Sequence, residues 1–306
     1  DRYPGDLLSA VPNYLTTLIE KKKISQSAIS FLGDFKSKII FVDHHTSHAR
    51  LGIENSKFKD ALIFSTDAWS ESKCTVIYEF KNYKLKNIES FFFPNSIGCF
   101  YGAITNFLGF TPLSDEWKVM GMSAYGNYKK VNKKFFDIIK LLPNGGYQLD
   151  LKYFDHYNYE TNNWYSNNLT KIIGHPRGKE DKILTKHYDI AAATQKIFSD
   201  IMDHIIKNYS KRRNSKNIIL TGGCAMNSLY NGKLDKANSS KKINISFSPN
   251  DTGNAIGSAI EIIKQKNPKA NIKNINTFIG DDFTSKEIKR ELDLYKIKYT
   301  ELSEDQ

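Results

Sequence analysis

The sequence has few cysteines and no long apolar run. Cys74, Cys99 and Cys224 are odd in number, widely spaced and form no C-x-x-C pair. This pattern argues against a disulfide framework or a zinc ribbon and suits a reducing compartment. Apolar runs such as the one at 39–42 are far shorter than the roughly 18 residues of a membrane span. No apolar signal-peptide core follows Asp1. We therefore expect a cytoplasmic protein without a membrane segment.

The composition is that of a globular protein with a basic surface. Seventeen tyrosines and nineteen phenylalanines supply enough apolar surface to exclude a wholly disordered chain. Lysine and arginine outnumber the acidic residues by 44 to 33, which gives a net charge of +11. Such an excess can favour nucleic acid or another anionic ligand. Most of it is lysine scattered among asparagine and serine, so we interpret it as a solvated surface and do not expect nucleic acid as a partner.

Hydrophobic periodicity predicts a mixed α/β chain. Three apolar runs joined by short polar turns predict an antiparallel meander, and the later alternation of helices with strands predicts parallel pairing. Between these parts, residues 127–187 are irregular and are interpreted as an insertion that contains some helix at 131–142. The predicted helices are 8–22, 44–53, 97–108, 188–209, 225–234, 254–265 and 285–295, and the predicted strands are 38–43, 60–66, 73–80, 85–93, 217–220 and 243–247.

A meander followed by crossover units is the arrangement of a ribonuclease-H-like lobe. The shorter helix–strand–helix segment at the front resembles the end of a second such lobe, and two lobes in tandem form the actin-like (ASKHA) fold. We therefore expect an α/β chain with mixed sheets that lacks its N-terminal strands. Residues 1–57 would be the remainder of lobe I with a histidine motif. Residues 58–268 would be a nucleotide-binding lobe II, and 269–306 a linker and the start of a truncated domain.

A histidine motif at 43–48, DHHTSH, is the sharpest local feature. His44 and His48 are four residues apart, so on a helix both imidazoles share one face and could bind one metal ion. The alternative is a set of histidines that hydrogen-bond to the backbone. Asp251 follows a predicted strand, and it is either a helix N-cap or a third ligand at the same sheet edge. Two histidines and one carboxylate suit iron, manganese or zinc.

Other motifs carry weaker signals by themselves. Gly222 and Gly223 lie between a predicted strand and a helix, where they make either a tight turn or a nucleotide-binding turn. Asp67 lies at the first predicted hairpin turn of the lobe, the position at which actin-like proteins bind phosphate. The segment DEWKVMG at 115–121 mixes an acid, a base and glycine, and in isolation it is typical of a solvated turn.

Taken in order, these motifs resemble the NodU/CmcH-type O-carbamoyltransferases along nearly the whole chain. The resemblance implies an actin-like domain that receives carbamoyladenylate, made from carbamoyl phosphate and ATP by a YrdC-like domain that would follow in the same polypeptide. The domain passes the carbamoyl group to a hydroxyl of a small-molecule or sugar-like acceptor. The shared motifs are DHHTSHA, SIGCFYGAITNFLGF, DEWKVMGMSAYG, AAATQ, TGGCAMN and SPNDTGNAIGSA.

The resemblance also implies roles for individual residues. The family's metal ligands correspond to His44, His48 and Asp251, with iron favoured and zinc or manganese as alternatives. The nucleotide-binding residues correspond to Asp67, Gly222, Gly223 and Asn227. Glu116 and Lys118 match the family's acid and base near the nucleotide. A buried carboxylate or histidine would serve as the general base, and His45 is the histidine candidate.

Two departures leave other functions open. The family's D-G-x-G-E turn is DAWSE at 67–71 here, and the loss of both glycines restricts close backbone approach to phosphate. The tyrosines, histidine and tryptophan of the insertion would either stack on an acceptor or pack on the lobe. The alternatives are an enzyme related to the threonylcarbamoyl transferases of tRNA, or a nucleotide-binding relative without catalytic activity.

Overall fold

The structure is a computed structural model that describes residues 19, 39–158, 161–237, 241–272 and 280–302. Residues 1–272 form one compact unit and 273–306 another. Apart from Ile19, the predicted helix at 8–22 lies outside the described residues. The predicted strand at 38–43 is wrong over its described part, because residues 39–43 are irregular and the Ile40 and Phe41 side chains are 50% and 44% exposed. The described strands join into two sheets that leave this segment out, so it forms no ladder.

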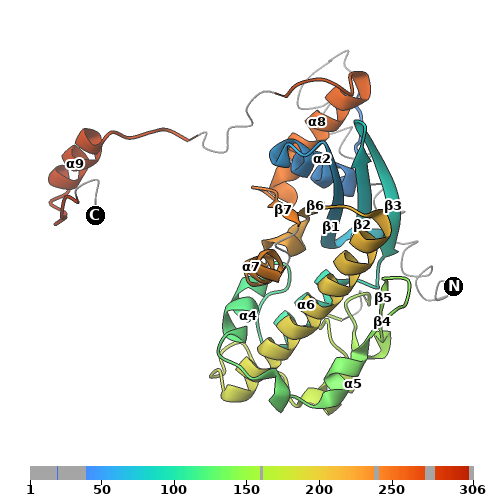
Figure 1. Cartoon of the computed structure of the whole chain (residues 1–306). Coiled ribbons are helices and arrows are strands. Elements are labelled where there is room, and N and C mark those ends of the chain that lie inside the picture. The colour runs from blue at the N-terminus through green and yellow to red at the C-terminus, as the bar shows by residue number, and fades with distance from the viewer. Residues whose placement is uncertain (1–18, 20–38, 159–160, 238–240, 273–279, 303–306) are drawn as a thin grey trace. The chain divides into compact units, whose positions relative to one another are not determined.

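A five-stranded mixed sheet lies at the centre of the first unit (Figure 1). Strands β1 (Asp60–Ser70), β2 (Lys73–Lys81) and β3 (Lys84–Phe92) form the predicted antiparallel meander. Strands β6 (Asn217–Thr221) and β7 (Lys242–Ile245) continue the sheet beyond β1, and both run parallel to it. The resulting order, β3-β2-β1-β6-β7, confirms the predicted arrangement of a meander followed by crossover units.

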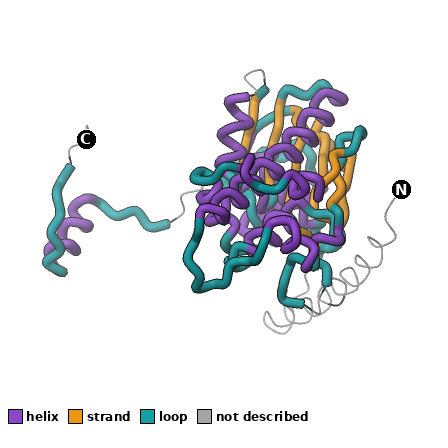
Figure 2. Tube along the Cα trace, turned by 90° about the horizontal axis from the view of Figure 1, so that it is seen from below, coloured by secondary structure: helices purple, strands orange, loops and turns teal. Residues whose placement is uncertain are grey.

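Helices cover both faces of this sheet (Figure 2). Helices α2 (His44–Ser56) and α8 (Asn254–Lys266) pack on one face. Helices α3 (Ile97–Phe107) and α6 (Thr185–Arg213) pack on the opposite face. Helix α2, which we assigned to the remainder of a first lobe, thus packs on the same sheet as the later elements. Among the described residues, no helix is both long enough and apolar enough to cross a membrane.

Alternation along β1 divides the core between the two faces. Leu62 and Phe64 point to the side of α3 and α6, where they join the larger apolar cluster. Ile63 points to the other side and packs with Ala49 and Ile53 of α2. Because successive strand residues face opposite sides of a sheet, one buried strand anchors both helical layers. The packing of Ala49 and Ile53 on Ile63 therefore holds α2 against this face of the sheet.

The insertion contains less helix than its prediction allowed. Within 131–142 the only described helix is the 3₁₀ helix η2 (Lys133–Ile138), which leads directly into a two-stranded hairpin. The η2 helix buries Phe135 and Ile138 in the larger cluster, and the following residues pair with a second strand, so a helix cannot continue.

The remaining elements of the first unit are short. They are α4 (Glu116–Ser123), η1 (Tyr128–Lys130), β4 (Ile139–Leu141), β5 (Tyr147–Leu149), η3 (Leu151–Tyr153), α5 (Asn167–Ile173), η4 (Gly223–Met226), α7 (Ser228–Ala237) and η5 (Asp251–Gly253).

The second unit contains the predicted tail helix. Helix α9 (Ser285–Leu294) begins at a capping box in which Thr284 and Glu287 exchange side-chain and backbone hydrogen bonds. Such reciprocal caps satisfy amide groups that the first helical turn leaves unpaired. The tail helix at 285–295 is therefore confirmed to within one residue.

Candidate active site

Asp43 is the N-cap residue of helix α2 and fixes the residue at which the helix begins. Asp43 accepts hydrogen bonds from the backbone nitrogen and the hydroxyl of Thr46, both at 3.0 Å, and pairs with Lys73 at 2.9 Å. Burial raises the pKa of Asp43, but Lys73 and Thr46 outweigh burial and lower it to about 2. The helix thus begins at His44, and the spacing of four residues puts His44 and His48 on one face.

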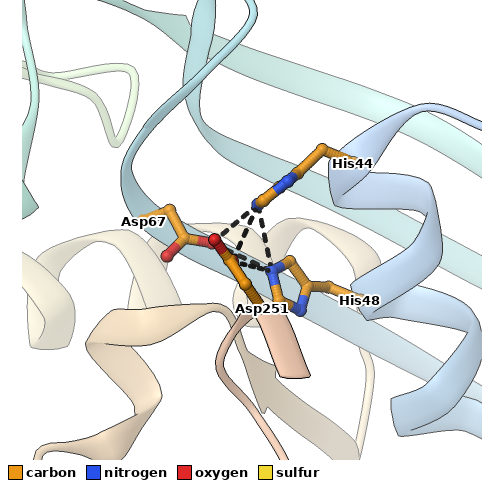
Figure 3. A group of neighbouring side chains, drawn as sticks. All are labelled: His44, His48, Asp67 and Asp251. Carbon is orange, nitrogen blue, oxygen red and sulfur yellow. Dashed lines mark hydrogen bonds and ion pairs between the residues drawn. The ribbon is translucent and has the colours of Figure 1, made fainter. Parts of the chain in front are cut away.

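Two histidines and two aspartates converge beside the end of β1 (Figure 3). The Nε2 atoms of His44 and His48 lie 3.1 Å apart. The Oδ2 atom of Asp67 is 3.4 Å from His44 Nε2 and 3.1 Å from His48 Nε2. The Oδ1 atom of Asp251, in η5, is 3.4 Å from each of the same two nitrogens. The structure therefore brings together residues from positions 44 to 251 around one point.

The spacing of these four ligand atoms fits a metal ion. They all lie within 4.8 Å of one another. Ligand atoms that bind one ion at about 2.1 Å are separated by about 3.0 Å at octahedral and about 3.4 Å at tetrahedral angles. The five separations given above fall within that interval. Two imidazoles and two carboxylates are also ligands that iron(II), zinc and manganese accept, so the residues fit such an ion.

Asp67 is the member of this group that the sequence placed elsewhere. We expected it at a phosphate, but its Oδ2 faces both imidazoles, while its Oδ1 accepts a hydrogen bond of 2.6 Å from the Gly223 backbone nitrogen. This contact depends on Gly222, which has φ of +84°. A Cβ atom at Gly222 would lie 2.3 Å from the carbonyl oxygen of Thr66. The glycine pair therefore brings a backbone amide close to β1 and orients Asp67.

The group is strongly coupled in its electrostatics. Burial lowers the pKa of His48, but the carboxylates of Asp251 and Asp67 outweigh burial and raise it to about 9. Burial raises the pKa of Asp67, but hydrogen bonds from His44 and His48 hold it well below its usual range. The Asp67 carboxylate is thus ionised at neutral pH, and it attracts positive charge to this point, whether from a proton or from a metal ion.

Close packing of α2 on α8 holds the two halves of the site together. At Gly257 in α8, a Cβ atom would lie 2.0 Å from the Ser47 carbonyl oxygen, so only glycine permits this approach. The buried Arg50 forms an ion pair with Glu261 of α8, and the Ser47 hydroxyl bonds to Ser258 at 2.9 Å. These contacts position the histidines of α2 against the residues at the start of α8.

A cavity of about 620 Å³ borders the group. Asp67 and Asp251 form part of its wall, so a molecule bound in the cavity would reach the ligand atoms. His48 is buried and His44 is 21% exposed, whereas Asp251 is 75% exposed. Among the described lining residues none is lysine or arginine. The other lining residues are Ala68, Trp69, Gly98, Tyr101, Leu113, Ser114, Glu116, Trp117, Met120, Phe198, Gly223, Cys224, Met226, Asn227, Asn250 and Thr252.

Four of the predicted nucleotide and acid–base residues line this cavity, and Asp67 is one of them. Gly223, Asn227 and Glu116 line its wall, and Gly222 lies behind it against β1. Asn227 exchanges side-chain hydrogen bonds of 3.1 and 2.9 Å with Gln195. Burial raises the pKa of Glu116, whose carboxylate accepts a 2.7 Å hydrogen bond from the Leu113 backbone nitrogen.

The other two candidates point elsewhere. The Lys118 ammonium pairs with Asp115 at 2.9 Å and is absent from the described lining of the cavity. His45 is fully buried, and its Nδ1 lies 2.8 Å from the Ser65 hydroxyl. Burial lowers the pKa of His45 to about 4, so this imidazole is neutral at pH 7. Both residues lie near the site without facing the cavity.

The insertion supports the cavity wall from behind. The rings of Trp164 and Phe93 each lie 5.7 Å from the ring of Trp69. The buried His156 packs 5.7 Å from Phe93. Of the two uses considered, the contacts of Trp164 and His156 are those of packing residues, and Trp164 packs on a tryptophan, Trp69, that lines the cavity.

The chain belongs to the carbamoyltransferase N-terminus family, whose model matches residues 2–260. It is 29% identical over 295 residues to the uncharacterized protein sll1178 of Synechocystis sp., an alignment that covers 92% of this chain and 47% of that protein. It is 27% identical over 268 residues to the nodulation protein NolNO of Sinorhizobium fredii, with 82% and 38% covered. The chain thus spans half or less of the length of the curated relatives it matches. The crystal structure of T. kodakarensis HypF aligns with a TM-score of 0.41 at 12% identity, over 78% of this chain and 38% of that one.

Proposed function

We propose that this chain is the group-transfer part of an O-carbamoyltransferase. It would move a carbamoyl group from carbamoyladenylate, made from carbamoyl phosphate and ATP, to a hydroxyl of a small-molecule or sugar-like acceptor. Family membership supports the class of reaction. The observation that carries the proposal is the convergence of His44, His48, Asp67 and Asp251 at the border of a cavity large enough for substrates.

The four ligand residues would bind one metal ion, for which iron is the favoured candidate and zinc and manganese are alternatives. When bound, such an ion supplies a Lewis acid that polarises a carbonyl and acidifies a coordinated hydroxyl. The chain's own contribution is to hold the ligands ready. The backbone amide of Gly223 fixes one oxygen of Asp67 and leaves the other directed at the imidazoles.

The transfer exchanges one carbon–oxygen bond for another. The acceptor oxygen attacks the carbamoyl carbon and forms the new ester bond, while the bond from that carbon to the adenylate phosphate oxygen breaks and AMP leaves with the electron pair. The proton of the acceptor hydroxyl passes to a base. Glu116 is our candidate, because its carboxylate lies in the cavity wall and burial raises its pKa, which makes it a better proton acceptor.

The cavity wall would position both substrates. Gly223, whose backbone nitrogen donates to Asp67, and Asn227 line the wall and would contact the adenylate. Trp69 supplies an apolar face for the acceptor. Holding acceptor and adenylate side by side removes much of the entropic barrier to their reaction. A YrdC-like domain that supplies the adenylate is part of the proposal, as the partner of this chain within a longer polypeptide.

The proposal is tested by giving the protein carbamoyladenylate together with a panel of polyhydroxylated acceptors and measuring the release of AMP. We expect release that depends on an acceptor and that is lost in His44→Ala. The variant Lys233→Ala is a matched control that we expect to retain most activity, since it removes only an exposed ion pair with Asp203. Acceptor-independent hydrolysis alone, equal in the wild type and in His44→Ala, would contradict the proposal.

A further inference from the structure

Asn254, the first residue of α8, lies between the two imidazoles of the site. Its Nδ2 atom is 3.2 Å from His44 Nδ1 and 3.3 Å from His48 Nε2. Its Oδ1 atom is buried and has no hydrogen-bond partner among the described residues. A buried amide oxygen without a hydrogen-bond donor costs free energy. In this orientation the surroundings of Asn254 offer its oxygen no donor.

The two ring nitrogens of His44 have different surroundings. Nε2 faces His48, Asp67 and Asp251, whereas Nδ1 faces Asn254. A neutral imidazole carries one proton, and a metal ion takes the lone pair of the other nitrogen. If Nε2 is to bind an ion, Nδ1 must carry the proton and needs a hydrogen-bond acceptor beside it.

The side-chain amide of Asn254 can supply this acceptor if it rotates by half a turn about its last side-chain bond. As placed, its NH₂ group donates to His44 Nδ1, which leaves the imidazole proton on Nε2, where it faces the carboxylates. The oxygen and nitrogen of an amide have nearly the same shape, so a half-turn about the last side-chain bond exchanges them. After the exchange, Oδ1 accepts the proton of His44 Nδ1. The same rotation withdraws the NH₂ group from His48 Nε2, whose lone pair an ion would also need.

We propose that Asn254 is a positioning residue that sets the tautomer of His44, and that its amide oxygen accepts the Nδ1 proton of His44 when the site holds a metal ion. The inference rests on the proposed metal site and adds a residue to it. Partners of this kind orient metal-binding histidines, and their removal typically weakens metal binding by about 10- to 100-fold.

The first test measures zinc affinity by competition with a chromogenic chelator, on the whole chain. We expect Asn254→Ala to weaken binding by about 10-fold or more. Asn254→Asp should restore most of the affinity, because a carboxylate also accepts the Nδ1 proton. The matched control is Ser258→Ala, which removes hydroxyl bonds to Ser47 and to the backbone carbonyl of Asn254 but leaves the Asn254 amide beside the histidines. Equal affinities in the wild type and in Asn254→Ala would overturn the inference.

The second test observes the tautomer directly. Nitrogen-15 NMR of zinc-loaded protein with labelled histidine should show a proton on Nδ1 of His44 that exchanges slowly with water in the wild type and in Asn254→Asp. In Asn254→Ala we expect the same proton to exchange much faster. Exchange that is unchanged in Asn254→Ala would overturn the inference while the metal site stands. A wild-type chain that binds no zinc, iron(II) or manganese would instead overturn the proposed metal site, and this inference with it.

Discussion

His156 gives the chain an acid sensitivity that can be calculated from its surroundings. The imidazole is buried in the insertion among the rings of Phe93, Phe154 and Trp164, at centroid distances of 5.7 to 6.4 Å. Its Nε2 lies 2.8 Å from the Pro94 carbonyl oxygen. Burial lowers the pKa of His156 to about 4, although the Pro94 carbonyl acts in the opposite direction. The folded chain thus holds this imidazole neutral.

The sign and size of the effect follow from proton linkage. In the unfolded chain the imidazole has an ordinary pKa of about 6.5, so unfolding takes up a proton at any pH between about 4 and 6.5. The contribution of His156 to stability is present above pH 6.5 and is lost as the pH falls toward 4. At pH 5 the difference in proton binding lowers the free energy of unfolding by about 2 kcal/mol.

Urea unfolding of the wild type and of His156→Gln at pH 7 and pH 5 measures this contribution. Glutamine retains a donor for the Pro94 carbonyl but does not titrate. We expect the wild type to lose about 2 kcal/mol more than the variant between the two pH values. His175→Gln, which replaces an exposed histidine, is the control and should leave the pH dependence unchanged. Equal losses in the wild type and in His156→Gln would refute the reasoning.

Three further predictions follow from particular contacts. Asp43→Ala removes both the cap of α2 and the ion pair with Lys73, so it should lower the free energy of unfolding by about 2 kcal/mol in urea titrations, and Asp43→Ser, which restores only the cap, should recover about half of that loss. Gly222→Ala puts a Cβ atom against the Thr66 carbonyl at a positive φ, so thermal unfolding should show a loss of about 2 kcal/mol, together with weaker metal binding. Trp69→Ala should raise the KM for the acceptor by about tenfold, whereas Trp69→Phe should raise it less. An unchanged stability in either of the first two variants, or an unchanged KM in the third, would contradict the corresponding contact.

The sequence was sufficient to predict a helix or a strand where one hydrophobic periodicity continued along the whole segment. The meander and the helix around 188–209 were predicted because alternation and helical spacing are sustained there, and each observed boundary lies within four residues of the predicted one. The helix within 131–142 is shorter than its predicted bounds, since local apolar spacing does not reveal that 139–141 pairs with a strand formed by later residues. The strand at 38–43 failed for a related reason: a strand requires neighbours, which local sequence does not identify.

The site was predictable to the extent that sheet topology and helical spacing define it. Asp251 was expected near His44 and His48 because the strands before them would end at one edge of the sheet. The strand at 38–43 is not formed, and α2 brings the histidines to that edge by packing on the sheet. Asp67 was recognised as functional but was expected at a phosphate. Its place beside the histidines depends on how α2 packs on the sheet, which the local sequence does not reveal. Asn254 gave no signal, since a polar residue at a helix start has an ordinary capping interpretation.

The most direct test of the central claim is the metal content of the purified chain, combined with anomalous scattering from its crystals. We expect about one metal ion per chain, with density about 2.0–2.2 Å from ligand atoms of His44, His48, Asp67 and Asp251. We also expect the ion to be lost in a His44→Ala, His48→Ala double variant that still folds. A chain that binds no ion under metal-replete conditions, or that binds one equally well after both substitutions, would contradict the account.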